Sequence, residues 1–183
     1  MAGCFPSPRI WELRAGKGSA YEGGVRVPAI VVWPGVTKPG TECATPIVTM
    51  DWSTTITGQK SDGADLRPLL HGDAIAPRPI YWHYPHYHPG GATPYSAVRE
   101  GDLRLVHFYE DDRVELFNLR DDPEEKRDLA ASRPGKAKTL RTQLDAWRAN
   151  VGAQAPAAPQ RRTQRIRIST PPRTHAVGSN ARL

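Results

Sequence analysis

The 183-residue sequence predicts a mixed α/β protein, and three patterns carry that prediction. A nearly continuous apolar run over residues 27–33 is typical of a strand that is buried on both faces. Three segments between residues 95 and 119 are predicted as antiparallel strands, because short acidic connections that suit hairpins join them. Residues 135–151 carry a single apolar stripe at helical spacing, which predicts a helix packed across that sheet.

The first third of the chain contains short elements separated by turn residues. Residues 1–12 show no periodicity and are predicted to be irregular, whereas a Pro-Gly pair ends the predicted strand at residues 27–33. Residues 47–56 fit either a short helix or a strand, since the threonines near their end weaken a helix. Residues 58–63 are predicted to form a loop, and a helical turn follows at residues 66–70.

The second half of the chain predicts a small sheet and one long helix. A first strand is expected at residues 78–84, followed by strands at 95–99, 103–109 and 113–119. Within residues 103–109 both faces mix polar and apolar side chains, so we expect this sheet to be covered on one side only. The helical stripe that would cover it consists of four residues: Leu140, Leu144, Trp147 and Val151.

The net charge of +6 comes entirely from the C-terminal end. Residues 1–150 contain as many basic as acidic side chains, and six arginines with no acidic residue follow Val151. We expect residues 153–183 to be a basic disordered tail, because so few apolar residues cannot bury enough surface to order it. Alternatively, this tail binds polyanions through counterion release, which would allow weak contacts with nucleic acid.

Composition also bears on membrane association, secretion and disulfide bonding. The longest apolar run is far shorter than the roughly 20 residues of a membrane span, so no membrane is expected as a partner. The N-terminus lacks the basic and apolar regions of a signal peptide. Two cysteines, Cys4 and Cys43, are too few for a disulfide framework and leave the compartment open.

The most informative stretch is residues 13–28, where Lys17 stands among four glycines next to a Tyr-Glu pair. Glycines allow positive φ angles and close approach of a ligand, and a lysine held among them suits an anionic group such as sulfate or phosphate. A nucleotide-phosphate loop is excluded, because that motif requires Ser or Thr directly after the lysine and Gly18 intervenes here. A solvated lysine in an ordinary glycine-rich loop is the competing interpretation.

The same stretch resembles a known family. Residues 16–28, with the pattern Gly-Lys-Gly-x-x-Tyr-Glu-Gly-Gly-x-Arg-Val-Pro, are similar to the type I (arylsulfatase-like) sulfatases. Blocks at 33–40, 46–51, 62–72 and 82–87 follow in the family's order, so the resemblance covers roughly residues 13 to 152. It implies a C-terminal part of a sulfatase: a remnant of the alkaline-phosphatase-like core, then a small four-stranded antiparallel sheet with a C-terminal helix.

This resemblance also implies a domain organisation and site roles. Residues 1–60 would be the edge of the core, residues 61–152 the C-terminal subdomain, and residues 153–183 the tail. Lys17 would be catalytic and substrate-binding, contacting the sulfate ester oxygens and stabilising charge in the transition state. Three further matches, Tyr21, Glu22 and Arg26, are expected to brace the loop, and Asp51 matches a position that opens a helix.

Three histidines lie within six residues and form a second candidate site. Imidazoles suit zinc or copper, but His83, His86 and His88 have irregular spacing and no neighbouring cysteine, so a metal site is the weaker interpretation. An aromatic, histidine-rich loop that stacks on a sugar is favoured, with simple packing as the third alternative. The resemblance would place the loop at the mouth of a sulfatase pocket, with His83 and His86 binding substrate.

Two parts of the family's machinery are expected to be missing. The family's formylglycine arises from cysteine in a Cys-x-Pro-Ser-Arg motif; residues 4–9 are Cys-Phe-Pro-Ser-Pro-Arg, with an inserted proline and in the wrong order relative to Lys17. Calcium, the cofactor of the intact family, needs several converging oxygen ligands, and Glu12 is the only acid before Lys17. No cofactor or metal is therefore expected to bind this chain.

These observations predict a sulfatase-family protein of the sulfuric ester hydrolase lineage whose partner is a sulfate ester or sulfated carbohydrate. The chain is expected to be inactive alone, because the formylglycine cysteine and the calcium ligands are missing. Two alternatives stay open: a non-catalytic module that binds anionic or sulfated sugars, and a non-functional truncated product.

Overall fold

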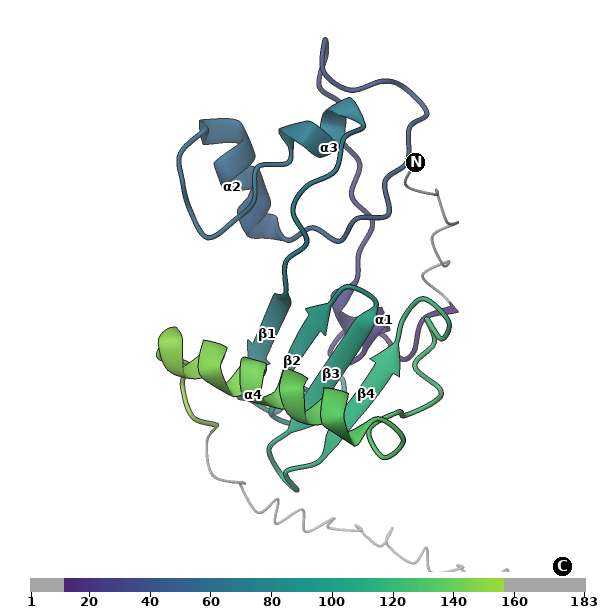
Figure 1. The fold of residues 1–183 in the computed structure, drawn as a ribbon, viewed down its shortest axis with the longest axis vertical. Helices are drawn as coiled ribbons and strands as arrows, with labels where there is room; N and C mark the ends of the chain where they lie inside the picture. The colour runs from purple at the N-terminus through teal and green to yellow at the C-terminus, as the bar shows by residue number, and fades with distance from the viewer. Residues whose placement is uncertain (1–11, 157–183) are drawn as a thin grey trace, which may run out of the picture.

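The centre of the protein is a four-stranded antiparallel sheet, seen in a computed structural model that describes residues 12–156 (Figure 1). The strand order is β1-β2-β3-β4, and the register aligns Trp82 with Ala97, Ala97 with Val106 and Val106 with Glu115. The predicted strands are confirmed, with these bounds: β1 Ile80–Tyr84, β2 Tyr95–Glu100, β3 Leu103–Phe108 and β4 Val114–Asn118. The motif around Cys4 and nearly all of the predicted tail lie outside the described residues.

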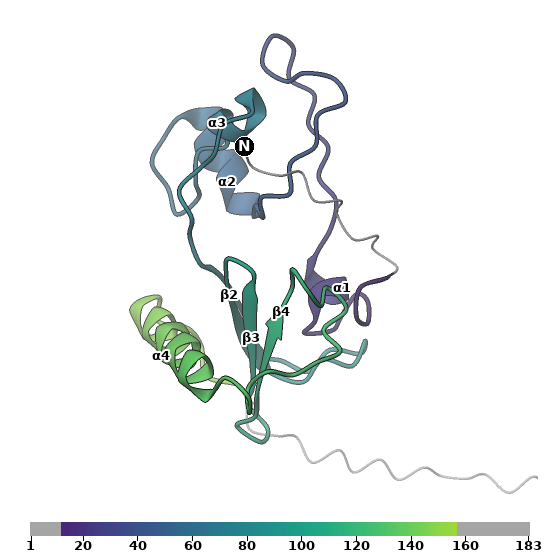
Figure 2. The ribbon, with the colours of Figure 1, turned by 45° about the vertical axis from the view of Figure 1, so that its right-hand side comes forward.

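A single helix covers one face of the sheet. The C-terminal helix α4 (Pro134–Asn150) starts with a proline, whose fixed φ suits the first helical turn. Its Leu140 and Leu144 are fully buried against Val98, Leu105 and Leu116 of the sheet (Figure 2). The predicted helix is thus confirmed, except that the last member of its stripe, Val151, lies beyond the helix end and is half exposed.

The opposite face of the sheet is also covered, so the prediction of a one-sided sheet is wrong. Residues 12–25, including the short helix α1 (Glu22–Val25), pack across it on the side away from α4 (Figure 2). Ala20 meets Ala97, Val106 and Phe108 there in a second apolar cluster. The sequence pattern suggested a solvent-exposed face of the sheet because it contains Arg104. In the structure the guanidinium of Arg104 is buried among acidic partners.

Two further helices lie apart from the sheet, beyond the end where β1 begins (Figure 1). Helix α2 (Thr49–Thr57) settles the choice between helix and strand, and α3 (Arg67–His71) corresponds to the predicted turn. The buried carboxylate of Asp51 accepts hydrogen bonds from the amides of Val48 and Ala64, each at 2.8 Å. This first-turn acid outweighs the weak propensity of the threonines, and Gly58 ends the helix in the left-handed conformation.

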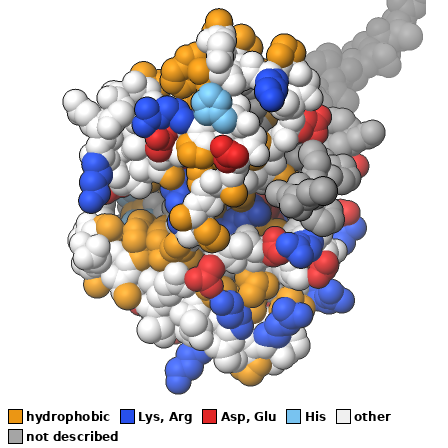
Figure 3. Space-filling model, turned by 45° about the horizontal axis from the view of Figure 1, so that its top comes forward, with side chains coloured by type: hydrophobic (Ala, Val, Ile, Leu, Met, Phe, Trp, Pro, Cys, Tyr) orange, Lys and Arg blue, Asp and Glu red, His pale blue; other side chains and the backbone are white. Residues whose placement is uncertain are grey.

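The apolar run at residues 27–33 is not a buried strand, and that prediction is wrong. Its backbone is extended but pairs with no strand among residues 12–156, and Val27, Ile30 and Val32 are 80%, 91% and 85% exposed. Hydrophobic side chains are prominent on the face shown in Figure 3. Apolar composition predicted the extended conformation, but burial requires a neighbour that the described residues do not supply.

None of the helices in residues 12–156 combines the length and the apolar character that a membrane crossing requires.

The buried side chain of His107 predicts that the stability of this fold is sensitive to acid. Burial, followed by the charge of Arg141, lowers the pKa of His107. Its Nε2 donates to Asp112 Oδ1 at 2.8 Å, whereas Nδ1 is buried without a partner. Protonation would place charge on that atom, so the folded state favours the neutral ring. The unfolded state takes up the proton first, near pH 6.5, and stability falls as the pH drops below that value.

We therefore expect His107→Gln, which keeps the donor to Asp112, to lose less stability than wild type between pH 7.5 and pH 5.5. Wild type is expected to show the larger loss, because only wild type carries the imidazole whose pKa burial lowers. Urea unfolding at the two pH values measures it. The exposed His71→Gln serves as the matched control and should behave like wild type; an equal loss in H107Q and wild type would contradict the assignment.

Candidate functional site

The loop that carries Lys17 packs directly against the β1–β2 loop at residues 85–94. Gly18 has a φ of +86°, and a Cβ added to it would lie 2.2 Å from Nδ1 of His88. The amide of Ala92 donates to the carbonyl of Gly18 at 2.9 Å, which joins the two loops through the backbone. A glycine is therefore required at position 18 both for its conformation and for the contact with His88.

Two more glycines fold residues 14–24 back on themselves. A Cβ at Gly23 would lie 2.4 Å from the carbonyl oxygen of Ala15, and one at Gly24 would lie 2.2 Å from that of Ser19. Since backbone atoms cannot retreat as a flexible side chain can, only glycine fits at these two positions. The result is a tight loop with Lys17 at its exposed apex.

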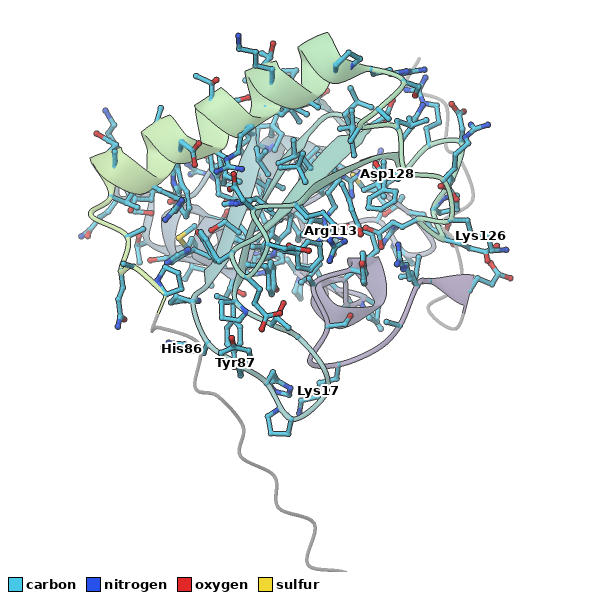
Figure 4. The ribbon with its side chains drawn as sticks, turned by 90° about the horizontal axis from the view of Figure 1, so that it is seen from below. Lys17, His86, Tyr87, Arg113, Lys126 and Asp128 are labelled. Atoms are coloured by element: carbon cyan, nitrogen blue, oxygen red, sulfur yellow. The ribbon has the colours of Figure 1, made fainter. Side chains whose placement is uncertain are left out.

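Lys17 has no counter-ion among the described residues. Its side chain is exposed, and its ammonium makes no hydrogen bond or ion pair within residues 12–156. Figure 4 shows Lys17 at the same end of the molecule as His86 and Tyr87, which come from the β1–β2 loop. A cavity of about 190 Å³ lies between the two loops and is lined by Gly18, Ser19, Gly24, Tyr84, His88, Ala92 and Tyr95.

Beneath the loop lies a buried ionic network that fixes it to the sheet. The fully buried guanidinium of Arg104 donates to Glu125 Oε1 at 2.6 Å and to the carbonyl of Ala20 at 2.5 Å. The second oxygen of Glu125 accepts the amide of Glu22 at 2.7 Å. Burial raises the pKa of Glu125, and the charge of Arg104 opposes that rise. The loop is thus held from below by charge-assisted hydrogen bonds in a dry environment.

The residues expected to brace the loop do so. The buried carboxylate of Glu22 lies 3.8 Å from Arg26, 3.6 Å from Arg99 and 3.7 Å from Arg104. The phenol of Tyr21 donates to Glu115 at 2.9 Å, and the guanidinium of Arg14 stacks 3.6 Å above the Tyr21 ring. These contacts leave the ammonium of Lys17 as the charged group that the loop presents outward.

The structure separates His83 from Lys17. Successive side chains of β1 alternate between faces, and His83 lies with Tyr81 on the side that α4 covers. Its Nε2 donates to the carbonyl of Gln154 at 2.8 Å, which leaves Nδ1 to accept from Ser96 at 2.7 Å. Both ring nitrogens are therefore occupied, and burial lowers the pKa of His83.

The other two histidines lie on the side of Lys17. His86 is exposed and its ring meets Tyr84 edge-on, with 5.5 Å between ring centroids. The Nδ1 of His88 accepts the amide of Gly90 at 2.9 Å. A metal site would need His83 to join them, and no three His, Cys, Asp or Glu side chains converge within residues 12–156.

A second hollow, of about 440 Å³, is less suited to an anion than the apex at Lys17. Its lining contains three carboxylates against two cations: Glu12, Glu124 and Glu125, with Arg14 and Lys126. Lys126 also pairs with Glu124 at 2.5 Å. Sequence reasoning missed the role of Glu125 and Arg104; the available signal was a lone arginine in the apolar alternation of β3.

A family model matches most of the chain. Residues 16–150, well over half of the chain, match the family model for "N-sulphoglucosamine sulphohydrolase, C-terminal". The chain belongs to the sulfatase family. The match begins at Gly16 and ends with α4, so it spans the Lys17 loop, the sheet and the helix that covers it.

Individual relatives support the same assignment over part of their length. A sulfatase of Formosa agariphila is 32% identical over 160 residues, covering 74% of this chain and 29% of that protein. Human arylsulfatase A is 39% identical over 104 residues, covering 53% of this chain and 20% of that protein. The chain therefore spans less than a third of the curated relatives it matches.

A solved structure shares this fold. The crystal structure of Ps i-CgsB in complex with k-i-k-neocarrahexaose superimposes with a TM-score of 0.60 and 25% sequence identity. The alignment covers 74% of this chain and 31% of that chain. The sheet, its covering helix and the loop packed beneath it thus belong to an arrangement that occurs within larger proteins.

The buried network predicts that replacing Arg104 strongly lowers the stability of the protein. Arg104→Met leaves Glu125 buried without its partner, and we expect a loss of about 3–5 kcal/mol in the free energy of unfolding. Because the pKa of the unpaired Glu125 rises further, the folded variant binds a proton that the unfolded chain does not, and its stability decreases as the pH rises. Urea unfolding at pH 6 and pH 8 measures both effects.

The exposed Arg120→Met is the matched control, since its pair with Asp102 lies at the surface and is worth about 0–1 kcal/mol. A loss in Arg104→Met no larger than in Arg120→Met would show that the network does not hold the loop.

Proposed function

We propose that this chain forms the part of a sulfatase site that binds a sulfated carbohydrate, with Lys17 contacting the sulfate ester oxygens. The observation that carries the proposal is the position of Lys17: an exposed ammonium with no counter-ion among residues 12–156, at the apex of a loop fixed by buried ion pairs. A surface lysine usually moves freely, whereas the backbone that carries this one is held by three glycines and the network at Arg104.

The chemistry of sulfate suits this arrangement. A sulfate ester spreads negative charge over three oxygens, and a compact ammonium stabilises such charge without demanding a fixed orientation. As the ester bond breaks, negative charge grows on the leaving group and the sulfuryl oxygens, and a positioned cation stabilises that change. We propose that His86, which is exposed on the neighbouring loop, hydrogen-bonds a sugar hydroxyl beside the ester.

The carbohydrate part of the proposal rests on the relatives. Ps i-CgsB was solved with a neocarrahexaose, which is an oligosaccharide, and curated relatives are named as sulfatases. A loop with exposed Tyr87 and His86 beside Lys17 offers an aromatic surface and a hydrogen-bonding ring, the groups that recognise sugars in open sites.

We propose further that these 183 residues do not hydrolyse sulfate esters by themselves. They contain no Cys-x-Pro-Ser-Arg sequence to supply a formylglycine nucleophile. The described residues also do not fit the family's calcium ion, because their buried carboxylates already have partners. Asp51 and Glu125 are occupied by arginines and backbone amides, and Glu22 is surrounded by arginines. Lys17 would then act on substrate whose nucleophile is supplied elsewhere.

Binding of a sulfated sugar tests the role of Lys17. We expect Lys17→Ala to weaken binding of a monosulfated disaccharide by about tenfold to a hundredfold, the range for a lost charge-assisted hydrogen bond. Isothermal titration calorimetry measures the affinity, and the desulfated disaccharide shows how much depends on the sulfate. The wild-type affinity should also fall as salt is raised.

Lys60→Ala, at an exposed lysine near the end of α2, is the matched control and should bind like wild type. Unchanged affinity in Lys17→Ala, or no measurable binding by wild type, would refute the binding role. Turnover of an aryl sulfate by the 183-residue protein would refute the proposal that it is inactive alone.

A further inference from the structure

Tyr87 is the exposed aromatic side chain closest in sequence to the contact between the two loops. It precedes His88, whose ring meets Gly18, and Gly18 follows Lys17. The Tyr87 side chain is 43% exposed, and Figure 4 shows it at the same end of the molecule as Lys17. An aromatic ring this exposed contributes little to the core, so its position needs another explanation.

A hydrogen bond from a different hairpin orients this ring. The phenol of Tyr87 donates to Glu110 Oε1 at 2.8 Å, and Glu110 belongs to the turn between β3 and β4. This hydrogen bond raises the pKa of Tyr87, so the phenol keeps its proton and remains a donor. The hydroxyl of Tyr87 is thus held by Glu110 while much of the side chain stays exposed to solvent.

Glu110 differs from the other two acids of its turn. Asp111 pairs with Arg113 at 3.2 Å, and Asp112 pairs with Arg141 at 3.1 Å and with His107 at 2.8 Å. Glu110 pairs with no cation among the described residues; its partner there is the neutral phenol of Tyr87. The turn therefore presents one uncompensated carboxylate next to the aromatic ring.

The Lys17 loop and the β3–β4 turn hold opposite charges on the side of the molecule where Tyr87 lies. Within residues 12–156, Lys17 has no anionic partner and Glu110 has no cationic partner, and the phenol of the exposed Tyr87 donates to Glu110. A sulfate group is attracted to the first and repelled by the second. Hydroxyl groups can donate to the free lone pairs of a carboxylate, and the apolar face of a sugar ring can stack on tyrosine.

We propose that Tyr87 and Glu110 form a sugar subsite that accepts an unsulfated ring next to the sulfated ring held at Lys17, and that Glu110 disfavours a second sulfate there. This inference rests on the proposed function, because it takes Lys17 as the site of the first sulfate. In this subsite the preference for an unsulfated ring comes from repulsion of sulfate by Glu110 as much as from stacking on Tyr87.

Three probes and three variants test the subsite. The probes are a monosulfated monosaccharide, a disaccharide carrying that sulfate on one ring, and the same disaccharide sulfated on both rings; calorimetry measures their affinities. Wild type should bind the monosulfated disaccharide more tightly than the disulfated one. Glu110→Gln should reduce that preference by roughly two- to fivefold, the range for an exposed charge pair.

Tyr87→Ala should weaken both disaccharides by about five- to tenfold through lost stacking and leave the monosaccharide unchanged. Tyr87→Phe keeps the ring but removes the hydroxyl that donates to Glu110. Its affinity for the disaccharides should therefore lie between those of wild type and Tyr87→Ala. Asp73→Asn, an exposed acid after α3 at the opposite end of the molecule, is the control for charge and should retain the wild-type preference.

The outcomes separate this inference from the proposed function. Suppose that Lys17→Ala weakens binding as expected. If Glu110→Gln then keeps the wild-type preference, or if Tyr87→Ala binds the disaccharides like wild type, the subsite is refuted while the role of Lys17 stands. If Lys17→Ala binds every probe like wild type, the proposed function itself fails. A stronger preference for the monosulfated disaccharide in Glu110→Gln would likewise overturn the assignment.

Discussion

The burial of one guanidinium determines how this protein is put together. Arg104 stands in the middle of β3 with no exposure to solvent, and an unpaired charge in such a place would be strongly unfavourable. Its partners come from far along the chain, Glu125 after β4 and the Ala20 carbonyl in the loop before α1. Satisfying this charge therefore requires the N-terminal loop to close over the sheet, and that closure places Lys17.

Much of the fold could be predicted because it follows from local patterns. The hairpins and α4 have regular periodicity and recognisable turns, and their predicted limits differ from the observed ones by only one or two residues. The covering of both faces could not be predicted in this way. It depends on the pairing of Arg104 with Glu125, which are 21 residues apart, and nothing in the local pattern of either segment reveals the other.

The candidate site was predictable only in part. The glycines around Lys17 predicted a tight loop, and the structure gives each of Gly18, Gly23 and Gly24 a steric reason. The sequence alone did not show that His83 and His86 would lie on different sides of the sheet. Strand alternation sends His83 to the face under α4, whereas the loop carries His86 to the side of Lys17, and the change from strand to loop at Pro85 decides this.

The exposed segment from Val27 to Val32 has a thermodynamic consequence for how the protein behaves. Its extended backbone leaves amides and carbonyls unpaired among the described residues, and each large aliphatic side chain would gain about 1.5–3 kcal/mol on burial. A partner that buried these side chains only in the folded state would raise the melting temperature of this protein as the partner's concentration increased.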